Sequence, residues 1–175
     1  MGLYNTREGS FLLDGKEFTP FQNYNWQKII SFVPQNSYLI DGSILENITY
    51  GTKSSDIDNS RVEECAKTSE IFEFLKKTDS GLNTFVGERG IKISGGQKQR
   101  ISLARALYGK NQILLLDEAT NALDQKIEKK ILENLKNIKL NKIIIIISHH
   151  SDIDKFVDVT YEIRNKTISL IDIQN

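Results

Sequence analysis

Hydrophobic residues along the chain form two kinds of pattern, and each predicts a different element. Short runs that are wholly or largely apolar are typical of buried strands, and they lie at Lys28–Val33, Ile113–Leu116 and Ile143–Ile147. The last of these is β-branched throughout, so we expect it to be buried on both faces of a sheet. Apolar residues spaced three and four apart are typical of amphipathic helices, and they lie at Gln97–Tyr108 and Lys126–Ile138. Strands that alternate with helices predict an α/β domain with a mostly parallel sheet.

The outer and middle segments complete this picture. An apolar run at Ser10–Leu13 ends at the turn pair Asp14-Gly15, and two alternating runs near the end, Val157–Ile163 and Thr167–Ile171, predict edge strands. The stretch from Asn36 to about Gly90 has little strand character and predicts a helical insertion, with one or two helices at residues 61–77. We therefore interpret residues 1–175 as one partial domain. Its α/β core comprises residues 1–35 and 110–175, and its helical subdomain comprises about 36–109.

Composition bears on size, partners and compartment. A chain of 175 residues with 39% hydrophobic content suits one domain with a sizeable core. Lys and Arg number 23, as do Asp and Glu, so charge gives no reason to expect nucleic acid or an anionic membrane as a partner. The one cysteine, Cys65, follows Val62 at helical spacing and is expected to be a buried core residue. No apolar run approaches the ~20 residues that a membrane-spanning helix needs.

The strongest chemical feature is the pair of carboxylates that follows the apolar run Ile113–Leu116. In an open α/β sheet, the carboxyl ends of the strands form the ligand site, and Asp117 and Glu118 come directly after such an end. In phosphoryl transfer the first carboxylate can hold Mg²⁺ and the second can activate a water molecule. An ordinary strand followed by a helix-capping acid would give the same pattern.

A second feature is the segment Ser94-Gly95-Gly96-Gln97, which opens a basic helix. Two glycines allow a backbone to approach an anion closely, and a helix N-terminus offers free N–H groups. Ser94 could cap the helix or bond a phosphate oxygen directly. A plain glycine turn is the alternative interpretation.

Three further features lie near predicted strand ends. Gln35 follows Pro34, and His149 follows the isoleucine run, so either side chain could reach a terminal phosphate or a catalytic water. A histidine in such a place can also be structural. The segment Asn121–Asp124 closely follows the carboxylate pair, and Asp124 is a candidate N-cap for the helix at 126–138.

Taken in this order, the five motifs resemble those of the ATP-binding-cassette (ABC) ATPases, over almost the whole chain. Phe32–Gln35 resembles the Q-loop of that family, and Ile93–Arg100 resembles its signature motif, with Ile93 where leucine is usual. Leu114–Glu118 resembles Walker B, Asn121–Asp124 the D-loop, and Ser148-His149 the switch histidine. Two more segments, Ser43–Gly51 and Val86–Gly90, are similar to the corresponding segments of exporters or flippases rather than to those of importers.

The resemblance implies a P-loop NTPase-like core that binds ATP and Mg²⁺ in a head-to-tail dimer. On the family pattern, Ser94, Gly95, Gly96 and Gln97 grip the γ-phosphate of the opposite subunit's ATP, and Asp124 organises the dimer contact. Asp117 and Gln35 hold Mg²⁺, and Glu118 polarises the attacking water. His149 and Gln35 sense the γ-phosphate.

The resemblance also implies partners and a location. The segment Asn36–Ile40 would dock against a cytoplasmic coupling helix of a transmembrane domain, and a second nucleotide-binding domain would complete the dimer. No nucleic-acid partner is expected. The predicted location is the cytoplasmic face of the cell (inner) membrane. The chain would belong to an ATPase that couples hydrolysis to export.

One family motif has no match in the sequence. The Walker A pattern is G-x-x-x-x-G-K-S/T, but Gly15-Lys16 is followed by Glu17, and Gly109-Lys110 is followed by Asn111. The stretch Gly2-Leu3-Tyr4 fits a position just past the Walker A helix, which suggests a gene fragment, a split domain or an incomplete gene model. We therefore expect this chain alone not to turn over ATP. We also expect the strands at 113–116 and 143–147 to lack a neighbouring strand, and the chain to aggregate as a result.

Two other functions share parts of this pattern. A non-hydrolysing accessory subunit would donate its signature face to a partner's ATP and do no chemistry with its own carboxylates. A chromosome- or repair-type ATPase head would share the signature and Walker B logic. Such a head is expected to carry long heptad arms and basic DNA-facing patches, and the sequence contains neither.

Overall fold

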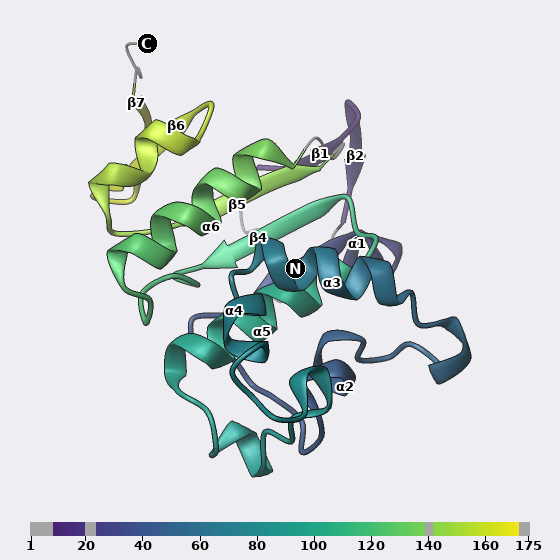
Figure 1. The fold of residues 1–175 in the computed structure, drawn as a ribbon. Coiled ribbons are helices and arrows are strands. Elements are labelled where there is room, and N and C mark those ends of the chain that lie inside the picture. The colour runs from purple at the N-terminus through teal and green to yellow at the C-terminus, as the bar shows by residue number, and fades with distance from the viewer. Residues whose placement is uncertain (1–8, 20–23, 139–141, 172–175) are drawn as a thin grey trace.

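The computed structural model describes residues 9–19, 24–138 and 142–171, and it contains a parallel sheet with helices packed against it (Figure 1). The predicted segment Gly2-Leu3-Tyr4 lies outside the described residues. The sheet has the order β3-β4-β5, with β3 at Ile30–Val33, β4 at Ile113–Asp117 and β5 at Ile143–Ile147. This confirms the predicted α/β class with a parallel sheet.

The middle position in the sheet belongs to β4. Ile113 lies opposite Ile30 of β3 and Ile143 of β5, and both pairings are parallel. The prediction that residues 113–116 would lack a neighbour is therefore wrong, because β4 is hydrogen-bonded on both sides. Among the described strands, β5 pairs with β4 alone.

The two long helices lie on one face of the sheet. One is α5 (Gly95–Tyr108), which connects β3 to β4 after the helical segment, and the other is α6 (Gln125–Asn137), which connects β4 to β5. Both crossovers step one strand in the same direction, and right-handed crossovers then place both helices on the same side. The core between them and the sheet contains Ile101, Leu114, Leu116, Ile131 and Leu135.

The opposite side of β5 faces solvent in the described structure. Ile144 and Ile146 pack against the core, whereas Ile143, Ile145 and Ile147 are 61%, 47% and 47% exposed. The prediction of burial on both faces is therefore wrong for β5. The alternation of a strand sends every second side chain to the face without helices, and no described element covers that face of β5.

Two antiparallel hairpins form separate sheets of their own. The first joins β1 (Phe11–Leu13) to β2 (Lys16–Phe18) through Asp14-Gly15, where both residues have positive φ as a tight hairpin turn requires. The second joins β6 (Thr160–Arg164) to β7 (Thr167–Ile171). The predicted strands near the C-terminus are present, but they pair with each other and do not extend the parallel sheet.

Short helices fill the region between β3 and α5. They are α2 (Ile44–Ile48), α3 (Asn59–Thr68) and α4 (Phe72–Leu75), with 3₁₀ turns at 54–56, 81–83 and 88–90; another turn lies at 151–156. Neither α1 (Tyr24–Lys28) nor α2 was predicted from the sequence. In the described part of the chain, no helix has the length and apolarity that a bilayer-spanning segment requires.

Cys65 lies in α3 and is buried, as predicted. Burial raises the pKa of its thiol to about 11, so the nucleophilic thiolate is scarce at neutral pH. We expect the native chain to resist alkylation by iodoacetamide at pH 7.5, where a pKa of about 11 gives ~3,000-fold more thiol than thiolate. We expect it to react once guanidinium chloride exposes the side chain. Mass spectrometry measures the rate of alkylation with and without denaturant. Equal rates would contradict the buried position of Cys65.

Candidate functional site

The candidate site has two parts, and the first is a cluster of polar side chains around Glu118. The Glu118 carboxylate accepts hydrogen bonds from Gln35 Nε2 and from Asn121 Nδ2, the latter at 3.0 Å, and it contacts His149 Nε2. Gln35 follows β3, Glu118 follows β4 and His149 follows β5. The carboxyl ends of parallel strands meet at one edge of the sheet, and this edge brings the three side chains together.

The backbone of Glu118 is unusual. Its φ is 47°, in the left-handed region that residues other than glycine, asparagine and aspartate seldom occupy. Its N–H donates to the carbonyl oxygen of Ile147 at 3.0 Å, which prolongs the pairing of β4 with β5 by one residue. This conformation costs about 1–2 kcal/mol and turns the side chain out of the line of the strand, toward Gln35 and His149.

Asp117 and Gln35 are the residues that were predicted to hold Mg²⁺. Asp117 is the last residue of β4 and is partly exposed. Gln35 donates through its amide nitrogen to Glu118, which leaves its amide oxygen as an acceptor. Within the described residues, no group of three or more histidine, cysteine or acidic side chains could enclose a metal ion. This donor set fits Mg²⁺, because that ion is usually held by one or two carboxylates together with substrate phosphates and water.

The second part is an open groove beside the N-terminus of α5, which we call the signature groove. Its volume is about 320 Å³, and its lining consists of Ser94, Gly95, Gly96, Arg100, Ala122, Leu123, Asp124 and Ile127. Two of its walls are helix starts. Ser94 is the N-cap of α5 and Asp124 is the N-cap of α6, as predicted for Asp124.

The glycines of the groove allow close packing. A Cβ atom at Gly96 would lie 3.0 Å from the carbonyl oxygen of Ala122, which is tighter than ordinary contact, whereas one at Gly95 would meet the Ala122 Cβ at 3.8 Å. Gln97 is turned back on the helix start. Its Oε1 accepts from the Ser94 N–H at 2.8 Å, and the Ser94 Oγ accepts from the Gln97 N–H at 3.3 Å. This capping box satisfies two donors at the start of α5.

Gln99 connects the two parts of the site and was not predicted from the sequence. Its side chain is buried. Its Oε1 accepts from the Ala122 N–H at 3.1 Å, and its Nε2 donates to the carbonyl oxygen of Gln35 at 3.4 Å. A glutamine on the inward side of an amphipathic helix is a signal that could have identified it. Asn121 was also missed as a partner of Glu118, although it lies in a motif that was recognised.

Two charged side chains, those of Arg100 and Asp124, line the signature groove. Burial lowers the pKa of the Arg100 guanidinium, while the charges of Asp124 and Glu70 act in the opposite direction.

His150, the residue after His149, belongs to neither part of the site. Its Nδ1 lies 3.2 Å from the Glu128 carboxylate.

The fold and these two regions can be compared with known proteins. The sequence profile of the ABC transporter family matches residues 1–121, and this chain belongs to that family. Its structure is similar to that of a bacterial Atm1-family ABC exporter with ATP bound, with a TM-score of 0.80 and 35% sequence identity. That match covers 89% of this chain and 27% of the exporter chain.

Curated relatives are exporters and flippases. The chain is 45% identical over 147 residues to a putative export ATP-binding/permease protein of Rickettsia felis, covering 83% of this chain. It is 37% identical over 153 residues to the ATP-dependent lipid A-core flippase of Vibrio parahaemolyticus, covering 87% of this chain. The chain spans 25% and 26% of the length of these two relatives.

Proposed function

We propose that this chain supplies part of the ATP-hydrolysing unit of an ABC exporter, in which hydrolysis drives transport across a membrane. The observation that carries the proposal is the Glu118 cluster, where the carboxylate that follows β4 is held by side chains that follow the two neighbouring strands, β3 and β5. Such an arrangement suits the orientation of a water molecule for attack on a phosphate.

The two parts of the site are proposed to act on different nucleotides. No residue of the Glu118 cluster lines the signature groove among the described residues. The groove is exposed and presents a helix N-terminus, which attracts anions. In a head-to-tail dimer, Ser94, Gly95 and Gly96 would contact the terminal phosphate of the other subunit's ATP, with Gln97 steadying Ser94 and Asp124 near the dimer contact.

The Glu118 cluster would serve the ATP on its own subunit. Mg²⁺, when bound, would neutralise charge on the phosphates, and Asp117 and Gln35 are the residues that would hold it. Glu118 would accept a proton from the attacking water. His149 and Asn121 would keep the carboxylate turned toward that water, and His149 would also contact the terminal phosphate.

The chain is further proposed to consist of a core, residues 1–35 and 110–175, and a helical subdomain at about 36–109. The parallel strands fall in the first set of residues and α2–α5 in the second, which supports the division. The segment Asn36–Ile40 is proposed to dock against a transmembrane partner on the cytoplasmic side. Tyr38 and Tyr50 are exposed large hydrophobic side chains in and near this segment, which supports a contact surface there.

The first test compares this chain alone with an exporter chimaera, in which the chain replaces the matching segment of the Atm1-family exporter. We expect no steady-state ATP hydrolysis by the 175-residue chain, because its sequence contains no G-x-x-x-x-G-K-S/T loop to hold the phosphates. We expect the chimaera to hydrolyse ATP at a rate within about tenfold of a typical enzyme turnover of ~10 s⁻¹. Phosphate release is the measurement.

The outcomes of this test separate the candidate functions. Hydrolysis by the chain alone would contradict the proposal about the missing loop. A chimaera that binds ATP and hydrolyses none would favour the accessory subunit, which donates its signature groove and does no chemistry at Glu118. The matched control is the unmodified host exporter, prepared and assayed in the same way.

A further inference from the structure

Glu70 occupies a position that favours a different residue. It follows α3 with a φ of 59°, in the left-handed region. Its N–H donates to the Lys67 carbonyl oxygen at 3.0 Å, and the Ile71 N–H donates to the Ala66 carbonyl oxygen at 3.1 Å. This pair of bonds is the Schellman motif that ends a helix, and the left-handed residue in that motif is usually glycine. The presence of glutamate at this position therefore has to be explained by the contacts that its side chain makes.

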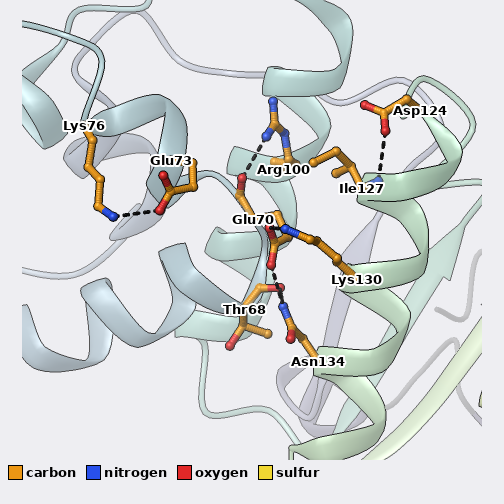
Figure 2. Close-up of polar contacts among 9 residues, drawn as sticks. All are labelled: Thr68, Glu70, Glu73, Lys76, Arg100, Asp124, Ile127, Lys130 and Asn134. Atoms are coloured by element: carbon orange, nitrogen blue, oxygen red, sulfur yellow. Dashed lines mark hydrogen bonds and ion pairs between the residues drawn. The ribbon is translucent and has the colours of Figure 1, made fainter.

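The Glu70 side chain connects this helix end to α6. It is only 17% exposed. Its Oε1 accepts from Asn134 Nδ2 at 3.0 Å, and its Oε2 lies 3.6 Å from Lys130 Nζ (Figure 2). Asn134 also donates to the Thr68 carbonyl oxygen at 3.2 Å. These contacts fix the end of α3 against the middle of α6.

The Glu70 backbone makes a second connection, to α5. The left-handed turn presents the Glu70 carbonyl oxygen to Arg100, whose Nη1 donates to it at 2.7 Å (Figure 2). The Nε of Arg100 donates to the Gly96 carbonyl oxygen at 3.2 Å. Arg100 therefore holds the first turn of α5 to Glu70, and Gly96 and Arg100 both line the signature groove.

Together these bonds form a continuous link between the two walls of the signature groove. One wall is the start of α5 with Gly96, and the other is the start of α6, where Asp124 Oδ1 accepts from the Ile127 N–H at 3.0 Å. Glu70 contacts both helices, α5 through its backbone and α6 through its carboxylate. We propose that Glu70 is a positioning residue that sets the width of the groove. Its consequence for catalysis rests on the function proposed above for the groove.

A disulfide across the groove can report this width directly. A Cβ atom at Gly95 would lie 3.8 Å from the Ala122 Cβ, which is within the range that disulfides require. A chain with Gly95→Cys and Ala122→Cys should therefore close the bond when oxidised glutathione is added. Cys65 is buried and its thiol pKa is raised to about 11, so it does not compete.

The test compares the rate of disulfide closure in three further backgrounds of this two-cysteine chain. Glu70→Gly relieves the backbone strain, so we expect the chain to fold. It removes both contacts of the carboxylate with α6 and leaves only the bond from Asn134 to the Thr68 carbonyl oxygen. We expect closure to slow about tenfold, as loss of one charge-assisted hydrogen bond would predict. Glu70→Gln keeps an acceptor for Asn134, and we expect it to restore most of the rate.

The matched control is Glu73→Gln. Glu73 pairs with Lys76 at 2.7 Å on the same short segment (Figure 2). Among the described residues, no hydrogen bond or ion pair joins this exposed pair to α5 or α6. We expect its closure rate to stay within about twofold of the parent. Circular dichroism and the thermal midpoint confirm that each variant is folded. Closure in the folded Glu70→Gly chain at the parent rate, or a Glu73→Gln chain as slow as Glu70→Gly, would overturn the positioning role.

A second arm separates this inference from the proposed function. In the exporter chimaera without the added cysteines, Glu70→Gly is expected to lower kcat about tenfold with little change in KM, and Glu70→Gln is expected to restore it. Slower disulfide closure together with unchanged hydrolysis would support Glu70 as a positioning residue and overturn the function proposed for the groove.

Discussion

Replacement of Glu118 by glutamine is expected to stop ATP hydrolysis in the exporter chimaera and to leave ATP binding intact. Glutamine has the shape of glutamate and keeps one oxygen for the bonds from Gln35 and Asn121, so the site should hold its geometry. It cannot accept a proton from water at neutral pH. Loss of a positioned general base lowers rates about 10²–10⁴-fold, and phosphate release together with nucleotide-binding titration measures both effects.

His150→Gln is the matched control for this experiment. His150 is the next residue after His149, but its ring contacts Glu128 and not Glu118. We expect its turnover to stay within about twofold of the parent, as for a surface contact of small energetic value. Substantial hydrolysis by the Glu118→Gln chimaera would remove Glu118 from the role of general base.

The second large effect is expected on stability, from Arg105→Ala. Arg105 lies on α5, and its guanidinium donates to the Asn47 carbonyl oxygen at 2.7 Å, to the Asn47 Oδ1 and to the Tyr38 carbonyl oxygen at 2.9 Å. Asn47 is fully buried, and its amide also bonds the backbone of Ile40 in both directions. Alanine would remove three donors from this network. The Asn47 Oδ1 would keep its bond from the Ile40 N–H, whereas the carbonyl oxygens of Asn47 and Tyr38 would lose the guanidinium. We expect the free energy of unfolding of the chain to fall by about 3 kcal/mol, measured by urea denaturation.

Two variants sharpen this experiment. Arg105→Lys keeps the charge but cannot reach all three acceptors from one point, so about half of the loss should remain. Lys110→Ala changes an exposed cation just beyond α5 and should shift the free energy of unfolding by less than about 0.5 kcal/mol. If the Arg105→Ala and Lys110→Ala chains had the same free energy of unfolding, the network around Asn47 would not hold the segment 36–51 against α5.

Much of the fold could be predicted because its signals are local. The strands at 113–117 and 143–147 contain the continuous apolar runs 113–116 and 143–147. Helix α6 begins at an aspartate cap whose side chain accepts from the Ile127 N–H. The short helix α2 was missed because five residues contain too little periodicity. Its capping box, Ser43 with Glu46, was present in the sequence as a signal.

Other features depend on neighbours that are distant in sequence. An unbroken isoleucine run looks the same whether helices cover one face of the strand or both, so the exposure of Ile145 could not be predicted. The candidate site residues Gln35, Glu118 and His149 could be selected by their positions at strand ends. Their convergence on one carboxylate depends on the strand order, which the sequence alone leaves open. Glu70 gave no local signal, because its partners lie 30 or more positions away.

The left-handed backbone at Glu118 and Glu70 has a consequence for engineering. Both positions would accept glycine or asparagine with less strain, so a selection for heat resistance alone should recover those residues there early. On the roles proposed here, the first replacement would remove the base and the second would loosen the groove. Thermal selection on this domain should therefore be combined with a screen for turnover, because two of the positions where glycine would relieve backbone strain are ones where the proposed roles need glutamate.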